Sequence, residues 1–482
     1  MATNGHRSPT VSVIQLENHS STLKLTSNED VSTIADGGEY NPFDNRDVKH
    51  PTGDCGALAH LLKCSVGTGV LAMPFAFLHG GTVFGPVVVV ALGLVCAHCM
   101  HILVKSSQKL CRQQKIPSLS FGHTAGVAFK HGPVWLRPFS HSLMNFVDIA
   151  ICITCYSTVC VYLVFVATTA KQIVENYYPE EDFDIRLYIA VAMPVAYLLA
   201  LVRNLEYLVP VSAAANVLLV AGFAITLYYM FREAPSVADK AYVAPLARLP
   251  TFLCTALFAM EGIGVVLPVE NTMVKPEHFL GCPGVLNIGM GVVICLFAVL
   301  GFCGYLRYGD DTQASITLNL PSDEILAEVA KGLIAVAILF SVGLQFIVPT
   351  DIMWTKLKKG VHSWRRTKEV AYRLSVMTLI GAVAIAVPNL GPIISLVGAV
   401  CYSTMGLFCP ASIDLATNWN GDLGRFKHVL WKDLLILALW LVILVLGTYT
   451  SVVDIARAYS PDHPAAASNC TESLPNCEAS LV

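Results

Sequence analysis

Residues 65–74 read S-V-G-T-G-V-L-A-M-P and lie in the middle of an apolar stretch over about 55–80. A second apolar stretch, over about 249–270, is interrupted at the same relative place by residues 261–268, E-G-I-G-V-V-L-P. A helix that crosses lipid is normally continuous, because each unpaired backbone group costs several kcal/mol there. Glycine pairs followed by a proline therefore predict two broken helices.

Two readings of these glycine pairs are open. Either pair alone fits close helix packing equally well, because glycines let two helices approach each other. Together, the pairs fall in the first and sixth predicted spans, which open two five-helix halves of opposite orientation. Matching interruptions in inverted repeats are typical of a binding site at the membrane midplane of a secondary transporter.

Eleven stretches are apolar and long enough to cross a membrane, for which about 20 residues are needed. They lie at roughly 55–80, 83–105, 139–172, 186–203, 205–231, 249–270, 284–306, 326–352, 371–387, 390–413 and 434–455. The junctions at Arg203–Asn204 and Pro388–Asn389 each fit a hairpin or one long kinked helix. The predicted fold class is an all-α polytopic membrane protein: a LeuT-like 5+5 inverted repeat plus one extra helix, with helices 1 and 6 broken.

The chain divides into five parts on this interpretation. A polar leader over 1–50 contains no apolar signal sequence and is predicted to be disordered and cytosolic. The first five-helix repeat covers 51–231, and the second, inverted repeat covers 232–413. A cytosolic loop and the eleventh helix follow over 414–455, and residues 456–482 form an extracellular or luminal tail.

Composition supports a lipid-facing surface. Of the 482 residues, 55% are hydrophobic and only 13% are charged, whereas soluble proteins carry about 25% charged residues. The formal net charge of -3 argues against nucleic acid as a partner. The lipid bilayer is therefore the expected environment.

Loop charges predict the orientation, because basic loops stay cytosolic. The basic loops at 105–138 and 353–373 contrast with acidic loops at 173–186 and 305–325. Eleven spans with a cytosolic N-terminus put each loop on its expected side and place the C-terminal tail outside or in a lumen. The sequon at Asn469 then predicts glycosylation. In the same tail, Cys470 and Cys477 are the only cysteines that stand together in polar sequence, and they pair only in an oxidising compartment.

The interruptions suit a zwitterion. The N–H groups near Gly67, Thr68 and Gly69 are predicted to hold a carboxylate, because a helix N-terminus carries partial positive charge. Carbonyls at a helix C-terminus favour an ammonium group. The predicted substrate-binding residues are Ser65, Gly67, Thr68, Gly69, Phe258, Ala259, Met260, Glu261 and Gly262, in which the carbonyls of Phe258, Ala259 and Met260 hold the amino group.

Ionisable residues within the spans need a reason, because a charge at the membrane centre costs about 3 kcal/mol. Glu261 is interpreted as an amine partner or proton carrier, with a capping carboxylate as the alternative. His60 titrates in the physiological range, and a proton-coupling role stands equal to a hydrogen-bonded core role. Lys63 is expected to snorkel or to pair with Glu261, and Asp148 is expected to be structural.

The sequence predicts no cofactor other than the coupling proton, no metal site and no enzyme. His98 and His101 form a single pair, whereas a membrane di-iron site needs several histidine clusters, so a core pair is the preferred interpretation. Neither a Ser-His-Asp arrangement nor a phosphate loop stands out.

Five motifs resemble the proton-coupled amino acid transporter family of the amino acid/auxin permease superfamily. They are H-L-L-K-C-S-V-G-T-G-V-L-A-M-P at 60–74, F-A-M-E-G-I-G-V-V-L-P-V-E-N at 258–271, G-Y-L-R-Y-G at 304–309, S-I-T-L-N-L-P at 315–321 and I-S-L-V-G at 394–398. The resemblance runs from about His60 to Tyr449. It implies proton-coupled symport of small neutral amino acids such as glycine, alanine and proline, with His60 tied to proton coupling. It also implies plasma-membrane or lysosomal and late endosomal locations, with nutrient-signalling proteins as partners.

One departure from the family concerns a disulfide. Vertebrate relatives carry an extracellular disulfide that involves the loop matched here by 173–186, which has no cysteine. The loop at 173–186 is also shorter, which indicates an invertebrate-like member and leaves the substrate range open. Three rivals to proton symport remain: a sodium-coupled carrier of the same fold, a low-turnover amino acid sensor that signals to growth control, and a channel. A channel is disfavoured because no ring of pore-lining charge is evident.

Overall fold

The computed structural model describes residues 40–46, 48, 51–65, 67–180, 183–203, 205–232, 240–260, 262–358, 364–419 and 427–459. Within these ranges the secondary structure is helical apart from one isolated β-bridge between Thr52 and Met273. Glu261 and the tail residues Asn469, Cys470 and Cys477 lie outside the described residues.

Long helices make up the body of the protein. Seven are continuous: α3 (Phe84–Gln114), α5 (Ser140–Tyr177), α7 (Leu205–Arg232), α11 (Val285–Tyr308), α12 (Ile325–Leu357), α13 (Arg365–Ala386) and α16 (His428–Ala458). Others come in pieces: α1 (Asp54–Ser65) with α2 (Thr68–Gly80), α8 (Leu249–Ala259) with α9 (Ile263–Thr272), and α14 (Leu390–Val397) with the π-helical turns η6 (Gly398–Tyr402) and η7 (Thr404–Phe408) and α15 (Cys409–Asn418). The remaining α-helices are α4 (Phe121–His131), α6 (Ile185–Leu201) and α10 (Glu277–Leu280).

The protein is an all-helical polytopic membrane protein. Among the described residues, nine helices are long and apolar enough to cross a membrane, or ten when the bent pair α1 and α2 counts as one span. The predicted span at 186–203 corresponds to α6, which has 17 residues and is short for a crossing. The count of eleven therefore stays a prediction.

The two ambiguous junctions separate distinct helices. Helix α6 ends at Leu201 and α7 begins at Leu205, while α13 ends at Ala386 and α14 begins at Leu390. The prediction of a plain loop over 105–138 was wrong. Helix α3 continues to Gln114, and α4 follows after the N-cap Ser120, whose side chain accepts a hydrogen bond from the His123 N–H. The apolar face of α4 is buried among its neighbours rather than in lipid, so a search for long apolar stretches misses this helix.

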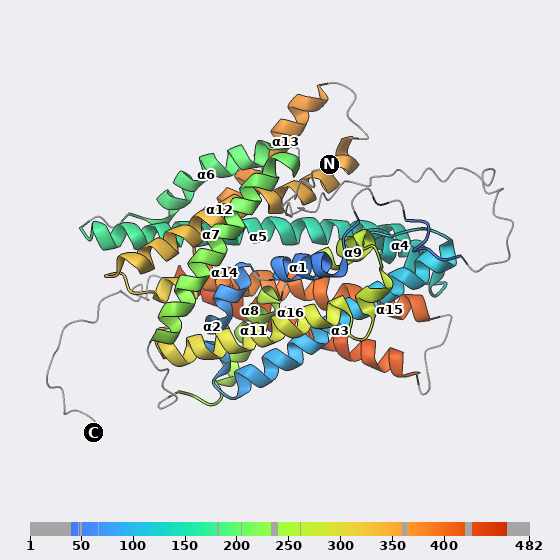
Figure 1. Ribbon diagram of the computed structural model, residues 1–482, viewed down its shortest axis with the longest axis horizontal. Coiled ribbons are helices and arrows are strands. Elements are labelled where there is room, and N and C mark those ends of the chain that lie inside the picture. The colour runs from blue at the N-terminus through green and yellow to red at the C-terminus, as the bar shows by residue number, and fades with distance from the viewer. Residues whose placement is uncertain are drawn as a thin grey trace, which may run out of the picture.

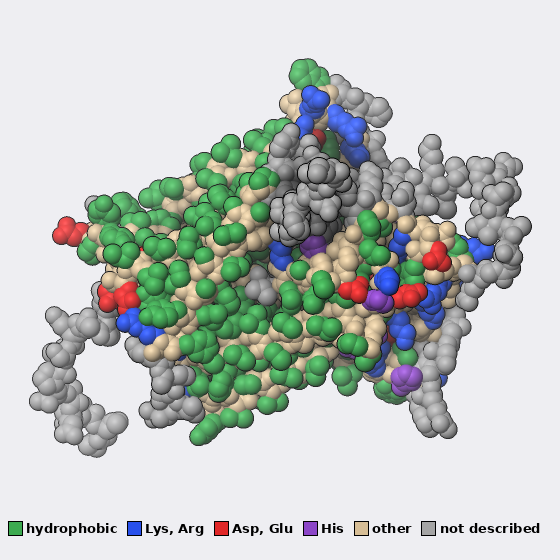
Figure 2. Space-filling view, in the orientation of Figure 1, with side chains coloured by type: hydrophobic (Ala, Val, Ile, Leu, Met, Phe, Trp, Pro, Cys, Tyr) green, Lys and Arg blue, Asp and Glu red, His purple; other side chains and the backbone are tan. Residues whose placement is uncertain are grey.

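The long helices pack around one main core of buried side chains (Figure 1). Helix α12 lies along α5 and α7, and α2 lies between α8 and α11. Helix α15 packs against α3, α4 and α16. We call the end with α4 and the last turns of α3 and α9 the basic end. The opposite end, with the last turns of α5 and α7 and the start of α12, is the acidic end. On the face shown in Figure 2, charged side chains gather at the two ends. The surface between the ends is largely hydrophobic, as expected for a belt that faces lipid.

Three residues singled out in the sequence have defined positions in the structure. Asp148 on α5 pairs with Lys356 on α12, with 2.6 Å between Oδ2 and Nζ, and this ion pair fits its structural interpretation. The interpretation of His98 and His101 as a core pair was wrong, because His98 is exposed and His101 is only half-buried. Their spacing of three residues puts both on one helix face, but that face lies at the surface of the described residues.

At the acidic end, Glu324 ties the start of α12 to α7. Its carboxylate accepts hydrogen bonds from the Tyr229 hydroxyl at 2.7 Å and from Arg232 Nη1 at 2.5 Å. These two donors, Tyr229 first and then Arg232, hold the pKa of Glu324 below its usual range. A lowered pKa means that the contact stabilises the fold above the usual glutamate pKa of about 4.3 and is lost as the pH falls through the lower, folded-state value.

We therefore expect the segment 312–324 to keep its protection from hydrogen exchange at pH 5.5 and above and to lose it in stronger acid. At pH 5.5 and above, Glu324→Gln should raise the exchange of this segment to the level that the wild type reaches only in stronger acid, so the acid-dependent step should disappear. Exchange is measured by mass spectrometry after correction for the intrinsic rate. An unchanged acid step in the variant would contradict the role of Glu324.

Candidate functional site at the two helix interruptions

The first interruption lies between α1 and α2. Helix α1 ends at Ser65, α2 begins at Thr68, and the two axes are bent by 51°. The N-cap residue Gly67 has no capping side-chain hydrogen bond. The first N–H groups of α2, from Thr68 onward, therefore have no partner within their own helix and carry the partial positive charge of its N-terminus.

The second interruption lies between α8 and α9. Helix α8 ends at Ala259, and the Met260 N–H donates to the Ala256 carbonyl at 3.0 Å. Helix α9 begins at Ile263. The carbonyl groups at the end of α8, including those of Phe258 and Ala259, have no N–H partner further along the same helix and carry partial negative charge.

The fold brings the two interruptions together. A Cβ on Gly69 would lie 2.5 Å from the Cα of Ala259, so the two backbones are in contact. A Cβ on Gly262 would lie 3.1 Å from Ser65 Oγ. Ser65 and Gly69 from one segment, and Ala259 and Gly262 from a segment almost 200 positions later, thus lie in one region that places a helix N-terminus beside a helix C-terminus.

Ser65 contributes a hydroxyl group to this region. Its side chain is buried, and Oγ has no hydrogen-bond partner among the described residues. Buried hydroxyl groups are normally hydrogen-bonded, so an orphan group at this place indicates a position for a ligand. A second orphan hydroxyl, Thr255 Oγ1, lies on α8 one turn before its end.

A small cavity borders the second interruption. It is lined by Cys96, Met100, Leu257, Met260, Gly262, Ile263, Tyr402 and Gly406, and its free volume is about 10 Å³. That volume accommodates about one water molecule. An amino acid therefore requires the helices to move apart at this site.

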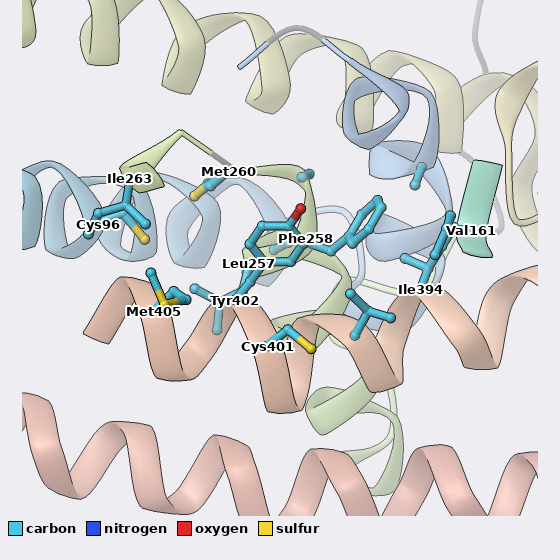
Figure 3. Packing of buried hydrophobic residues seen from close by; sticks show 14 of the residues in the cluster. Cys96, Val161, Leu257, Phe258, Met260, Ile263, Ile394, Cys401, Tyr402 and Met405 are labelled. Carbon is cyan, nitrogen blue, oxygen red and sulfur yellow. The ribbon is translucent and has the colours of Figure 1, made fainter. Parts of the chain in front are cut away.

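Sequence reasoning missed the aromatic side of the site. The ring of Tyr402, in the π-helical turn η6, meets the ring of Phe258 edge-on at 5.5 Å between centroids, as Figure 3 shows. The Tyr402 hydroxyl and Thr158 Oγ1 of α5 lie 2.7 Å apart, within hydrogen-bond distance. π-Helical turns occur frequently at functional sites, but a single sequence gives no signal for them beyond the glycine at Gly398, where a Cβ would overlap the Cys254 carbonyl.

The structure relates the proton-coupling candidates, His60 and Glu261, less directly to the two interruptions. His60 is half-buried on α1, about 7.5 Å along the helix axis from Ser65 at 1.5 Å per residue. Glu261 lies outside the described residues, so its predicted pairing with Lys63 is untested. Lys63 is exposed, and its Nζ donates to Ser212 Oγ of α7 at 3.4 Å.

An ion pair that the sequence did not reveal closes over the basic end. Arg46 Nη2 lies 3.1 and 3.2 Å from the two carboxylate oxygens of Glu270, at the end of α9. Arg46 also donates to the Glu270 carbonyl at 3.1 Å and to the Pro117 carbonyl at 2.9 Å. Arg46 belongs to the segment 1–50 that was predicted to be disordered, and its contacts differ from that prediction. The pair joins the N-terminal segment to α9 and to the connection after α3.

Comparison with known proteins supports a transport role. Residues 51–453 match the family described as transmembrane amino acid transporter protein. The Drosophila melanogaster protein named "Proton-coupled amino acid transporter-like protein pathetic" is 39% identical over 424 residues, covering 88% of this chain and 90% of that protein. The Arabidopsis thaliana "Amino acid transporter AVT3C" is 26% identical over 423 residues, covering 82% and 90%. These relatives are named as transporters and not as enzymes.

A solved structure shares the fold. The structure described as the inward-facing conformation of Mhp1 aligns with a TM-score of 0.51 at 11% identity, covering 89% of this chain and 94% of that chain. This likeness agrees with the LeuT-like fold class predicted above. The inverted-repeat division remains a prediction. By the match over 51–453 and the Drosophila relative, the chain belongs to the transmembrane amino acid transporter protein family.

Proposed function

We propose that this protein is a secondary active transporter that carries small neutral amino acids of the glycine, alanine and proline type together with protons, by alternating access. The observation that supports this most strongly is the contact between Gly69 and Ala259, which sets the N-terminus of α2 beside the C-terminus of α8. An amino acid carries a carboxylate and an ammonium group on one carbon atom, so it matches both helix ends at once.

The same geometry accounts for a small substrate. Glycine at position 69 and alanine at position 259 leave the backbones in contact, and Met260 and the rings of Phe258 and Tyr402 border the region. A short side chain requires the least separation of these groups. The orphan hydroxyl of Ser65 supplies one further donor for the carboxylate.

Proton coupling is assigned to His60 and Glu261, and the name of the Drosophila relative, which describes it as proton-coupled, supports this assignment. One proton per substrate is sufficient. A membrane potential of about 60 mV contributes roughly 1.4 kcal/mol, and one pH unit contributes about 1.4 kcal/mol more. The sum supports roughly hundredfold accumulation, because each 1.4 kcal/mol corresponds to a factor of ten.

Substrate-induced current in voltage-clamped cells tests the proposal. Glycine, alanine and proline are applied at pH 5.5 and 7.4, with and without sodium. Inward current that grows at low pH and does not depend on sodium is the expected result. Current that requires sodium would favour the sodium-coupled carrier. Absence of both current and radiolabel uptake, with binding intact at the surface, would favour the sensor.

Ser65→Ala should separate binding from stability. Loss of one hydrogen bond to the carboxylate should raise the KM for glycine about tenfold. The same change removes a buried hydroxyl that has no hydrogen-bond partner among the described residues, so the thermal stability of the substrate-free protein should stay equal or rise. Thr169→Val, which removes another orphan hydroxyl on α5, should leave KM unchanged. A Ser65→Ala variant with wild-type KM would place the carboxylate elsewhere.

The cellular location, the orientation of the two termini and the protein partners are parts of the same proposal. A plasma-membrane or lysosomal and late endosomal location, a cytosolic N-terminus and an extracellular or luminal C-terminus follow from the family resemblance and the loop charges. Glycosylation at Asn469 reports that orientation, because the tail is modified only on the luminal side. We expect the wild type to show a mass shift on glycosidase treatment and Asn469→Gln to show none. Nutrient-signalling proteins are the proposed partners, and co-purification with and without amino acid tests this.

A further inference from the structure

A buried charge cluster lies where α3, α15 and α16 meet, away from the two interruptions. It consists of Asp414 on α15 with Lys432 and Asp433 in the second turn of α16. Asp414 is 5% exposed and Asp433 is 0% exposed. Lys432 Nζ lies 2.8 Å from Asp414 Oδ2 and 3.2 Å from Asp433 Oδ1, so both carboxyl groups share one ammonium group.

The two carboxyl groups have very different surroundings. Asp414 accepts hydrogen bonds from Ser106 Oγ at 3.1 Å, from Asn418 Nδ2 at 2.8 Å and from Lys432 Nζ at 2.8 Å. Donors of this number and type stabilise an ionised carboxylate. Asp414 is therefore the member of the cluster that carries the negative charge and balances Lys432.

Asp433 has no comparable set of hydrogen-bond donors among the described residues. Neither of its oxygens accepts a hydrogen bond from the described residues, and the Lys432 ammonium group is within ion-pair distance only. Asp433 also lies beyond the first turn of α16, where the helix N-terminus no longer stabilises a negative charge. A second buried charge beside Asp414 would be uncompensated, because one ammonium group balances one carboxylate.

The groups on neighbouring elements do not change this balance. From α3, the Cys99 thiol faces Asp433, and the imidazole groups of His98 and His101 face Lys432 from the surface side. From α15, the facing charge is Asp414. A neutral thiol supplies no positive charge. His98 interacts with Lys432 and Asp414, and His101 interacts with Lys432, but neither histidine is among the groups that act on Asp433.

We propose that Asp433 is a proton-binding site: its carboxyl group holds a proton at neutral pH, in a buried Asp414–Lys432–Asp433 cluster that is separate from the substrate region. Protonation forms one O–H bond on an Asp433 oxygen with a proton from the basic end, and the cluster changes from a net charge of minus one to neutral. The neutral state keeps α16 packed on α15 at this end. Alkaline pH on that side removes the proton and weakens the packing. The inference does not depend on how transport is coupled, because its site and its test involve neither His60 nor Glu261.

Infrared spectroscopy of the purified full-length protein in lipid nanodiscs tests the proposal directly. The difference between wild type and Asp433→Asn at neutral pH should contain the carbonyl band of one protonated carboxylic acid. Asp454→Asn, on the same helix but 41% exposed at its side chain, is the matched control and should remove only an ionised carboxylate. Raising the pH should abolish the carbonyl band of the protonated acid in the wild type. In Asp433→Asn, the same change of pH should cause no loss of such a band.

A second variant keeps the test decisive. In Asp414→Asn, Asp433 is the one carboxylate left to balance Lys432 among the described residues, so the protonated band should be lost at neutral pH. The proposal is overturned if the wild type minus Asp433→Asn difference shows only an ionised carboxylate, or if Asp414→Asn retains the protonated band. Unfolding of Asp433→Asn beside a folded Asp454→Asn would also overturn it, because a neutral amide should replace a neutral acid without such damage.

Discussion

Gly69→Ala is expected to lower amino acid uptake about a hundredfold while the protein still reaches the membrane. The added Cβ would lie 2.5 Å from the Ala259 Cα and 3.0 Å from the Ala259 carbonyl oxygen. Both obstacles are backbone atoms, which cannot rotate away as a side chain would. Overpacking of this kind costs about 1–3 kcal/mol, and about 2.7 kcal/mol corresponds to a factor of one hundred. The strain falls on the contact that sets the two interruptions side by side.

Two glycines provide matched controls for this prediction. A Cβ on Gly291 of α11 or on Gly264 of α9 would meet nothing within 4 Å. Gly291→Ala tests a helix away from the site, and Gly264→Ala tests the second interruption itself. Both should transport at nearly the wild-type rate. Radiolabelled glycine uptake, normalised to surface protein, is the measurement, and size-exclusion profiles report folding. Wild-type uptake by Gly69→Ala would mean that the two interruptions are not in contact in the transporting protein.

The sequence was sufficient where one segment carries its own signal. Apolar length located the long helices, and the glycine pairs near Gly67 and Gly262 marked the places where helices end and begin. These signals are local, because lipid imposes the same demand on each segment separately. The contact between Gly69 and Ala259 was also within reach, since matching interruptions predict one shared site.

What the sequence did not reveal depends on pairs of distant residues. Arg46 and Glu270 are 224 positions apart, and Arg46 lies in a polar segment that has the composition of a disordered leader. Tyr402 lies beside Phe258 from a π-helical turn, and neither apolar length nor glycine spacing in the sequence predicts that contact. Helix α4 is short and buries its apolar face against protein, so neither length nor hydropathy distinguishes it from a loop.

Arg46→Met is expected to destabilise the protein by about 3–5 kcal/mol, the usual consequence of leaving one member of a buried ion pair without its partner. Arg46 and Glu270 are 5% and 1% exposed at their side chains, and Gln108 Nε2, which also donates to Glu270 at 2.9 Å, is the only other side-chain donor to that carboxylate among the described residues. Arg232→Met provides the matched control, because its pair with Glu324 is exposed to solvent and should contribute much less to stability than the buried pair. Thermal unfolding in detergent measures both.

The double variant Arg46→Met with Glu270→Met separates stability from closure of the basic end. Replacing a whole buried ion pair with apolar side chains is often neutral, so most of the lost stability should return. The hydrogen bonds from Arg46 to the Pro117 and Glu270 carbonyls do not return, so the basic end should stay less tightly closed. Cys111 on α3, 1% exposed and facing the ion pair, reports this opening through maleimide labelling followed by mass spectrometry. Labelling should increase in both variants. If it rises in the single variant and returns to the wild-type level in the double variant, Arg46 stabilises the fold but does not hold this end closed.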